Sequence, residues 1–393
     1  MMRLLLTGFL LIAVASPKCG DSSSSDSSSA PLMNFQSITV NAGPANNYFN
    51  GAFTSVTVCA PGQSTCQTID GILVDTGSTG LRVLASSLTL SLPQQADATG
   101  APIAECFQFL DGFTWGPVQT ADVKMGGEQA SSIPVQVIGT AGLPAIPAAC
   151  ANSGTPENTL DSLGANGVLG IGLFRQDCGA GCADTGSSNP GLYYACPPAG
   201  CHSIAQSLAR QVLNPVWLFA TDNNGVAIQL PSLPTGGSAT ASGMMVFGIG
   251  TQTNNALGSA KVLTVDANGD LLTSYGSQTY SGSYIDSGSN GIFFLDARTT
   301  GLPLCTQSTD FYCPASLSAQ SATIRGINAV NSPVNFNVGN ADALNGRFTA
   351  FSEVAGPNPG AFAWGLSFFF GRTVFTAIEG QGTPGGVGPY FAF

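Results

Sequence analysis

Two nearly identical runs in this chain each end an apolar stretch at a single aspartate. Residues 72–78 read ILVDTGS and residues 283–289 read SYIDSGS, so that Asp75 and Asp286 occupy matching positions. Only 8% of the residues are charged, which makes two aspartates at strand-to-turn junctions the best indication of chemistry. A repeat of this kind predicts a fold with two similar halves.

A second element repeats downstream of each aspartate run. Residues 166–172 read NGVLGIG, and residues 363–370 read AWGLSFFF. A glycine within an apolar run lets another backbone pass closely, as a strand beneath an active-site loop would require. One Asp-x-Gly sequence usually only caps a turn. Both elements occurring in both halves is a more specific sign of an active site than one such sequence.

The composition favours an all-β protein. Gly, Ser, Thr, Asn and Gln fill the gaps between short runs of Val, Ile, Phe and Leu, which is typical of many strands and turns. The length of 393 residues exceeds what one core usually serves, so we expect two core-bearing units. Residues 35–58 predict an opening hairpin, and residues 203–213 are the best candidate for a short amphipathic helix.

Charge and motifs exclude several function classes. Eleven Lys and Arg against 22 Asp and Glu give a net charge of -11, and no basic cluster could neutralise phosphates. Nucleic acid is therefore not an expected partner. The sequence has no P-loop, no GxGxxG after a strand and no G-x-S-x-G elbow, so we expect no cofactor. His202 is the only histidine, and we expect it to cap or to lie on the surface rather than to serve a Ser-His-Asp triad.

The N-terminus is typical of export. Arg3 precedes an apolar run over residues 4–15, which suits a secretory signal and is too short to span a bilayer as a mature helix. We expect residues 1–19 to be a signal segment and residues 20–34 a Ser-rich tether. Two outcomes stay open: cleavage after Ala15 gives a periplasmic or secreted protein, whereas lipidation of Cys19 attaches it to the membrane of the cell envelope.

Cysteine usage also favours an oxidising compartment. Setting Cys19 aside leaves ten of the 11 cysteines, an even number that suits five disulfides. The four clustered cysteines lack paired C-x-x-C units, so we favour disulfides over zinc there and expect no metal. The expected pairs are Cys59 with Cys66, Cys305 with Cys313, and Cys106 with Cys150, while the connectivity among Cys178, Cys182, Cys196 and Cys201 stays open.

The two aspartate runs and their downstream glycine elements resemble the pepsin-like aspartic peptidases. Residues 245–248 and 365–375 are similar to the strand that opens that family's second lobe and to its closing segment. The resemblance implies an all-β, bilobal fold with pseudo-twofold related, barrel-like lobes and few short helices. We place the N-terminal lobe at residues 35–236 and the C-terminal lobe at 237–393. Residues 247–252 and 381–391 also resemble an uncharacterised family of exported bacterial proteins related to pepsins.

The expected chemistry follows from placing two carboxyl groups together. Two such groups within hydrogen-bond distance cannot both ionise cheaply, so Asp75 and Asp286 would share one proton and titrate as a unit. A water between them could then attack a peptide carbonyl. Which aspartate is the base stays open.

The residues around each aspartate suit this role. Gly77 and Gly288 allow sharp turns whose N–H groups face the carboxylates, and Ser78 and Ser289 can donate hydroxyl hydrogen bonds to them. The resemblance implies that Thr76 and Ser287 reach across to the opposing loop and lock the lobes together. Residues 184–189, DTGSSN, spell the family's loop even better, but no apolar strand precedes them. We therefore expect Asp184 to be a solvated loop residue.

Two positions depart from the resemblance. The family places a Trp after the first aspartate loop, hydrogen-bonded to a Tyr on the flap, a mobile hairpin that closes over substrate. Here Arg82 stands at the Trp position, where it either lies near the dyad and lowers its pKa or is a surface strand residue. We interpret residues 107–126 as the flap hairpin, with Phe109 at the Tyr position and Trp115 or Tyr284 as a substitute.

These inferences give one main hypothesis and two rivals. The main one is a monomeric, exported aspartic endopeptidase that binds a peptide or protein substrate in the cleft between its lobes. In the first rival, the fold is kept without catalysis and the protein binds a protein or glycan at the cell surface or in the periplasm. The second rival, glycoside hydrolysis, needs carboxyl groups several ångströms apart, whereas paired loops predict closer ones.

Overall fold

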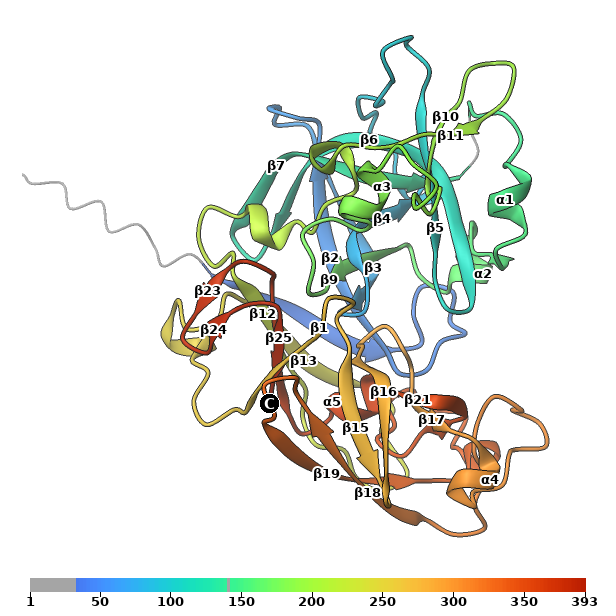
Figure 1. Cartoon of the computed structure of the whole chain (residues 1–393), viewed down its shortest axis with the longest axis vertical. Coiled ribbons are helices and arrows are strands. Elements are labelled where there is room, and N and C mark those ends of the chain that lie inside the picture. The colour runs from blue at the N-terminus through green and yellow to red at the C-terminus, as the bar shows by residue number, and fades with distance from the viewer. Residues whose placement is uncertain (1–32, 140–141) are drawn as a thin grey trace, which may run out of the picture. The chain divides into compact units, whose positions relative to one another are not determined.

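The computed structural model describes residues 33–139 and 142–393. The predicted signal segment, the Cys19 lipidation site and residues 20–32 of the predicted tether lie outside the described residues. Short strands dominate the rest, and its few helices span three or four residues each (Figure 1). The all-β expectation is thus confirmed.

The larger of the two main sheets has 16 strands in the order β11-β10-β5-β6-β7-β4-β9-β3-β2-β1-β13-β12-β22-β25-β14, with β8 paired to β6. Its strands are β1 (Phe35–Asn41), β2 (Gly51–Cys59), β3 (Cys66–Asp75), β4 (Thr79–Leu84), β5 (Ile103–Gln108), β6 (Gly112–Met125), β7 (Glu128–Ile138), β8 (Thr155–Pro156), β9 (Gly167–Ile171), β10 (Tyr193–Ala195), β11 (His202–Ser203), β12 (Gly225–Gln229), β13 (Ala241–Phe247), β14 (Val262–Thr264), β22 (Thr373–Ala377) and β25 (Tyr390–Ala392).

The second sheet has seven strands in the order β19-β18-β15-β16-β21-β17-β20, and β23 pairs with β24 separately. These strands are β15 (Leu271–Tyr275), β16 (Gln278–Ile285), β17 (Ile292–Leu295), β18 (Ser318–Arg325), β19 (Asn331–Val338), β20 (Ala355–Gly356), β21 (Asn358–Trp364), β23 (Gly382–Thr383) and β24 (Gly386–Val387). The helices are α1 (Ala148–Ala151), α2 (Leu160–Leu163), α3 (Ala180–Ala183), α4 (Ala297–Thr300) and α5 (Leu366–Phe369).

Strands from both predicted halves meet in the large sheet. The opening hairpin is present, since β1 pairs with β2, and the other edge of β1 pairs with β13. β12 pairs with both β13 and β22. The predicted lobe boundary between residues 236 and 237 therefore falls in the connection between two paired strands, and residues 33–393 form one compact unit.

Buried aromatic side chains fill the interior beside the second aspartate run. Phe362 stacks on Phe294 at 5.3 Å and on Trp364 at 5.4 Å between ring centroids. All three rings are fully buried, and full burial of such a side chain contributes about 1.5–3 kcal/mol. This packing fixes β17 and β21, the two strands that lie next to the Asp286 loop.

The predicted helix over residues 203–213 is wrong. Residue 203 lies in β11, and only Leu208–Arg210 form a single 3-10 turn without a side-chain cap. The amide of Gln211 instead donates to the carbonyl oxygens of Gly179 and Gln206, which holds the segment in an irregular path. Tertiary hydrogen bonds have overridden a weak local helical pattern.

Five disulfides link the ten cysteines of the described residues. The predicted pairs Cys59–Cys66, Cys106–Cys150 and Cys305–Cys313 are confirmed. The cluster left open by the sequence forms two short local bridges, Cys178–Cys182 and Cys196–Cys201. Five bridges indicate an exported protein, because disulfides persist in oxidising compartments. Among residues 33–139 and 142–393, no helix is both long and apolar enough to cross a bilayer.

Candidate active site

The first aspartate loop is supported by the glycine element downstream of it. β3 ends at Asp75, and β9 runs parallel to β3 and antiparallel to β4, so that the three strands lie side by side (Figure 1). A Cβ on Gly170 would lie 2.5 Å from the Thr79 nitrogen, and one on Gly172 would lie 2.6 Å from the Ser78 carbonyl oxygen. Only glycine allows β9 to pass this close to the loop.

The second aspartate loop is built in the same way. β16 ends at Ile285, immediately before Asp286, and pairs in parallel with β21. β21 also runs antiparallel to β17, as β9 does to β4. A Cβ on Gly365 would lie 2.6 Å from the Ser289 carbonyl oxygen. The repeated glycine elements thus lie beneath the two aspartate loops.

Hydrogen bonds across the two loops hold them against each other. The backbone N–H of Ser287 donates to the Thr76 hydroxyl at 3.0 Å, and that of Thr76 donates to the Ser287 hydroxyl at 3.1 Å. The Ser287 hydroxyl donates in turn to the Val74 carbonyl oxygen at 2.8 Å. These bonds are buried, so each is worth more than a surface contact.

Asn50 adds a connection that the sequence did not indicate, because an Asn-Gly pair predicts only a turn. Its buried amide donates to the carbonyl oxygens of Asn290 and Phe351, both at 2.8 Å. The Phe351 N–H donates back to the Asn50 side chain. The start of β2 is thereby tied to the chain beside the second aspartate loop.

The two loops bring Asp75 and Asp286 together. Their exposed fractions are 6% and 8%. The N–H groups of Gly77 and Gly288 each donate to the aspartate of their own loop at 2.7 Å. Each glycine also faces the opposing aspartate, since a Cβ on Gly77 would lie 2.6 Å from the Asp286 Cγ and one on Gly288 would lie 2.7 Å from the Asp75 Oδ1. The site therefore requires both glycines.

The pair is electrostatically strained. Burial, the charge of Asp286 and a hydrogen bond between the two carboxyl groups raise the pKa of Asp75 well above its ordinary value, in that order of size. The two loops differ in the placement of one donor: Ser289 donates its hydroxyl to Asp286 at 2.6 Å, whereas the Ser78 hydroxyl lies near enough to Asp75 to oppose the rise of its pKa but is outside hydrogen-bond geometry among the described residues.

Tyr48 lies close to the aspartates and was missed by the sequence reasoning. It packs edge-on against Phe53 at 5.6 Å. Burial raises the pKa of its phenol, and the charges of Asp111, Glu157, Asp286 and Asp75 raise it further. A tyrosine next to a turn carries no sequence signal for such a position.

The hairpin near the site is shifted from its predicted range. β5 and β6 pair from Ala104 with Pro117 to Gln108 with Phe113, so the tip lies at residues 109–111. The predicted range of 107–126 is wrong because β6 continues to Met125 and turns there into β7. Phe109 lies at the tip and contacts Phe107 at 4.8 Å.

Neither proposed substitute for the flap tyrosine lies at the tip. Trp115 is fully buried against Tyr194, and its indole N–H has no partner among the described residues. Tyr284 lies on β16, where burial and the charges of Asp286 and Asp270 raise the pKa of its phenol to about 12.

Both expectations for Arg82 are wrong. Its side chain is fully buried, so it is not a surface residue, and its guanidinium bonds to Glu105 and Asp177, each at 2.8 Å, rather than to the dyad. It also stacks on the Phe107 ring at 3.5 Å. The pKa of Asp75 is raised by burial and by Asp286, so the expected net lowering is not seen.

The DTGSSN run at residues 184–189 and the single histidine, His202, take no part in these contacts. Asp184 is half-buried after α3, between exposed neighbours, and accepts the Gly186 N–H at 2.9 Å, as a turn residue does. His202 is exposed in β11.

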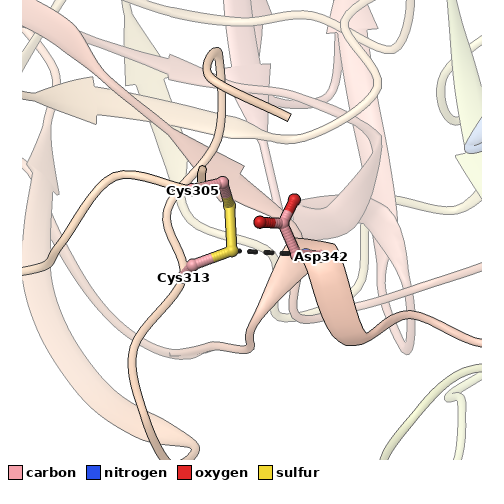
Figure 2. Close-up of side chains that lie close together, drawn as sticks. All are labelled: Cys305, Cys313 and Asp342. Atoms are coloured by element: carbon pink, nitrogen blue, oxygen red, sulfur yellow. Dashed lines mark hydrogen bonds between the residues drawn. A yellow bond between two sulfur atoms is a disulfide. The ribbon is translucent and has the colours of Figure 1, made fainter. Parts of the chain in front are cut away.

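One group of side chains in the described residues has the spacing of a metal site, namely Cys305, Cys313 and Asp342 (Figure 2). The two cysteines form a disulfide, which removes their thiolates as ligands. The Asp342 carboxylate accepts N–H bonds from Thr306, Gln307 and Ser308 at 2.9–3.1 Å. The group therefore closes a loop rather than forming a vacant ligand set.

Comparisons with known proteins agree with the fold. The crystal structure of an aspartic proteinase from Irpex lacteus aligns with a TM-score of 0.53 and 16% identity, covering 91% of this chain and 96% of that one. The likeness shows the pepsin-like fold alone. No curated protein sequence matches the chain. The sequence profile described as "Protein of unknown function (DUF3443)" matches residues 30–393, in agreement with the expected uncharacterised family. The chain therefore belongs to the DUF3443 family.

Proposed function

We propose that this protein is an exported aspartic endopeptidase in which Asp75 and Asp286 activate a water molecule to hydrolyse peptide bonds. The observation that carries the proposal is the pairing of two buried carboxyl groups on crossed, glycine-supported loops, with the pKa of Asp75 raised by burial and by Asp286. Such a pair holds a single proton and can act as acid and base together.

The hydrogen-bond donors support an assignment of roles. Asp286 accepts two donors and Asp75 accepts one, so Asp286 is the base and Asp75 carries the proton. Asp286 removes a proton from the water as its oxygen bonds to the substrate carbonyl carbon, while the Asp75 hydroxyl donates to the carbonyl oxygen. The carbon–nitrogen bond then breaks, and the departing amine takes up a proton from the dyad.

The substrate is an unfolded polypeptide bound in the cleft between the lobes. The fold supports this, because the Asp75 loop of one half and the Asp286 loop of the other meet where the two halves join. The disulfides support an extracellular or periplasmic site of action.

Cleavage of a denatured protein by the purified chain tests the proposal. We expect cleavage at acidic pH that a statine-type transition-state analogue blocks. Asp75→Asn and Asp286→Asn should each remove it, because each leaves one carboxyl group without its partner. Asp184→Asn is the matched control, since Asp184 stands in the same Asp-Thr-Gly-Ser sequence but lies in a half-buried turn that is not preceded by a strand. A folded wild-type protein that cleaves nothing between pH 3 and 8 would overturn the proposal, as would full activity in Asp75→Asn.

A pepsin-like binding protein without catalysis is the second candidate. A Ser78 hydroxyl outside hydrogen-bond geometry among the described residues and a hairpin tip that carries Phe109 favour it. In that case the same sample would be inert at every pH and would capture a protein or glycan of the cell surface.

We further propose that lipidated Cys19 holds the protein at the membrane of the cell envelope. Cys19→Ser should then release it into the soluble fraction. Recovery of the wild-type protein in that fraction would contradict lipidation.

A further inference from the structure

A second pair of carboxyl groups lies at the base of the β5–β6 hairpin, where one of the two is carried by β5 itself. No step of the proposed reaction uses this pair. Arg82 reaches from β4 to Glu105 on β5 and to Asp177 in the segment after β9, with both nitrogen–oxygen distances at 2.8 Å. The side chains of all three residues are fully buried. Taking charges out of water is costly, so such a cluster persists only with good geometry and further hydrogen bonds.

The charges of the cluster balance only if one carboxyl group keeps a proton. Burial and the charge of Glu105 raise the pKa of Asp177 well above its ordinary value, against the opposing effect of Arg82. Tyr193 donates its hydroxyl to Asp177 at 2.8 Å and accepts the Val212 N–H at 2.7 Å. One cation, one carboxylate and one carboxylic acid give a neutral group, in which Arg82 Nε and Glu105 Oε2 have no hydrogen-bond partner among the described residues.

The cluster contacts β5 of the hairpin directly, and Gln136 of β7 links the same part of β5 to β6. Glu105 and Phe107 are two residues apart on β5 and therefore share a face, and Arg82 contacts both. The amide of Gln136 donates to the Glu105 carbonyl oxygen at 2.9 Å and accepts the Thr114 hydroxyl of β6 at 2.8 Å.

The cluster also bonds to the first aspartate loop. Arg82 donates to the Thr79 carbonyl oxygen at 2.7 Å, and Thr79 is the first residue of β4, which follows the loop directly. A chain of buried contacts thus runs from the Asp75 loop through one guanidinium to the hairpin.

We propose that Arg82, Glu105 and Phe107 are positioning residues that hold the β5–β6 hairpin at a fixed place relative to the Asp75 loop, and so set how tightly a peptide is bound over the dyad. The peptide-binding half of this statement rests on the proposed function. A rigidly placed hairpin binds substrate without first having to be ordered, which favours affinity.

Phe107→Leu is the sharpest variant, because it removes the ring beneath the guanidinium and leaves the buried charges in place. The rate of hydrogen–deuterium exchange of the amides of residues 103–117 should rise about tenfold. This factor corresponds to the free energy lost with a desolvated cation–π contact. Phe107→Tyr keeps the ring and should restore slow exchange. Trp217→Leu removes a comparable stack, with Arg175 at 5.0 Å from the ring, and should leave these amides unchanged.

Kinetics test the second half of the proposal. Phe107→Leu should raise KM for a peptide substrate about tenfold with little change in kcat, because ground-state and transition-state binding weaken together. Phe107→Tyr should restore KM, and Glu105→Gln provides a second variant with the same expected signature.

The outcomes separate this inference from the proposed function. Unchanged exchange in Phe107→Leu overturns the anchoring of the hairpin, whether or not the protein is a peptidase. Faster exchange with unchanged KM overturns its role in substrate binding. A wild-type protein that cleaves nothing overturns the proposed function, and the exchange experiment then still decides the anchoring.

Discussion

The protein holds two pairs of carboxyl groups that differ in their surroundings. In the dyad, Asp75 and Asp286 come from different loops, remain 6% and 8% exposed, and have no cation among their hydrogen-bond partners in the described residues. At the base of the hairpin, the side chains of Glu105 and Asp177 are fully buried and both bond to the guanidinium of Arg82. Yet burial and a neighbouring carboxyl group raise the pKa of one aspartate in each pair.

The difference shows what separates a reactive pair from a structural one. Beside a guanidinium, the remaining proton and charges are fixed in a neutral group, and removing any member costs stability. In the dyad only backbone N–H and hydroxyl groups offset the charge, so its proton is available for transfer. We therefore expect substitutions in the structural pair to affect folding, and substitutions in the dyad to affect chemistry.

The largest expected change in stability is for Arg82→Met. It leaves two buried carboxyl groups without their cation, which should lower the free energy of unfolding by about 3–5 kcal/mol. Urea denaturation at pH 7 measures this change. The isosteric Asp75→Asn should lower it by less than about 1 kcal/mol, since it relieves repulsion in the dyad. Equal losses in the two variants would contradict the distinction between the pairs.

Glycine substitutions should have the next largest effect. Gly77→Ala puts a Cβ 2.6 Å from the Asp286 Cγ, so the carboxyl group must move at a cost of about 1–3 kcal/mol, and cleavage should be lost. In Gly186→Ala the nearest Asp184 oxygen is 3.3 Å away in an exposed turn, so the cost should stay below about 0.5 kcal/mol. Thermal unfolding and the cleavage assay compare the two variants.

The free energy of unfolding should fall as pH rises, because carboxyl groups of both pairs, and Glu157, have raised pKa values. Asp75 and Asp177 have pKa values raised by burial and a neighbouring carboxyl group, and burial with the charge of Asp111 raises the pKa of Glu157 to about 8. Between the ordinary values, about 4, and the raised ones, the folded state binds more protons than the unfolded state. The free energy of unfolding must therefore fall as pH rises through this window. Tm should be higher at pH 5 than at pH 8, and Asp177→Asn should weaken the trend.

The smallest expected effect distinguishes the two serines of the dyad loops. Ser289 donates to Asp286 at 2.6 Å, whereas Ser78 has no partner in the described residues. Ser289→Ala should lower kcat/KM about tenfold, the effect of one charge-assisted hydrogen bond, and Ser78→Ala should lower it less. A larger loss of kcat/KM in Ser78→Ala than in Ser289→Ala would indicate that Asp75 is the base and Asp286 carries the proton.

Much of the fold was predictable because its signals are local and repeated. The two aspartate runs and the glycine elements indicated crossed loops above threaded strands, and Gly170 and Gly365 are glycine because a Cβ there would collide with neighbouring backbone atoms. Two disulfide pairs followed from close cysteine spacing, and Cys106–Cys150 was the pair that remained outside the four-cysteine cluster. The expectation for residues 203–213 failed because the Gln211 side chain bonds to backbone far along the chain.

The surroundings of the dyad were less predictable because they depend on long-range packing. Nothing near Arg82 in sequence indicates that Glu105 and Asp177 will meet its guanidinium. The aromatic residue in contact with Arg82 is Phe107, which shares a face of β5 with Glu105, whereas Phe109 lies beyond the end of β5 at the hairpin tip. The fold of the β1–β2 connection likewise places Tyr48 where the charges of Asp111, Glu157 and the two dyad aspartates raise the pKa of its phenol.

The central claim is that Asp75 and Asp286 share one proton, and a carboxyl-carbon NMR titration of the folded protein tests it most directly. In the wild type, the Asp75 carboxyl group should titrate well above its ordinary value. In Asp286→Asn its pKa should fall, because the neighbouring charge is gone while burial remains. Titration of Asp75 near pH 4 in both proteins, with no response to Asp286→Asn, would contradict a shared proton and with it the proposed chemistry.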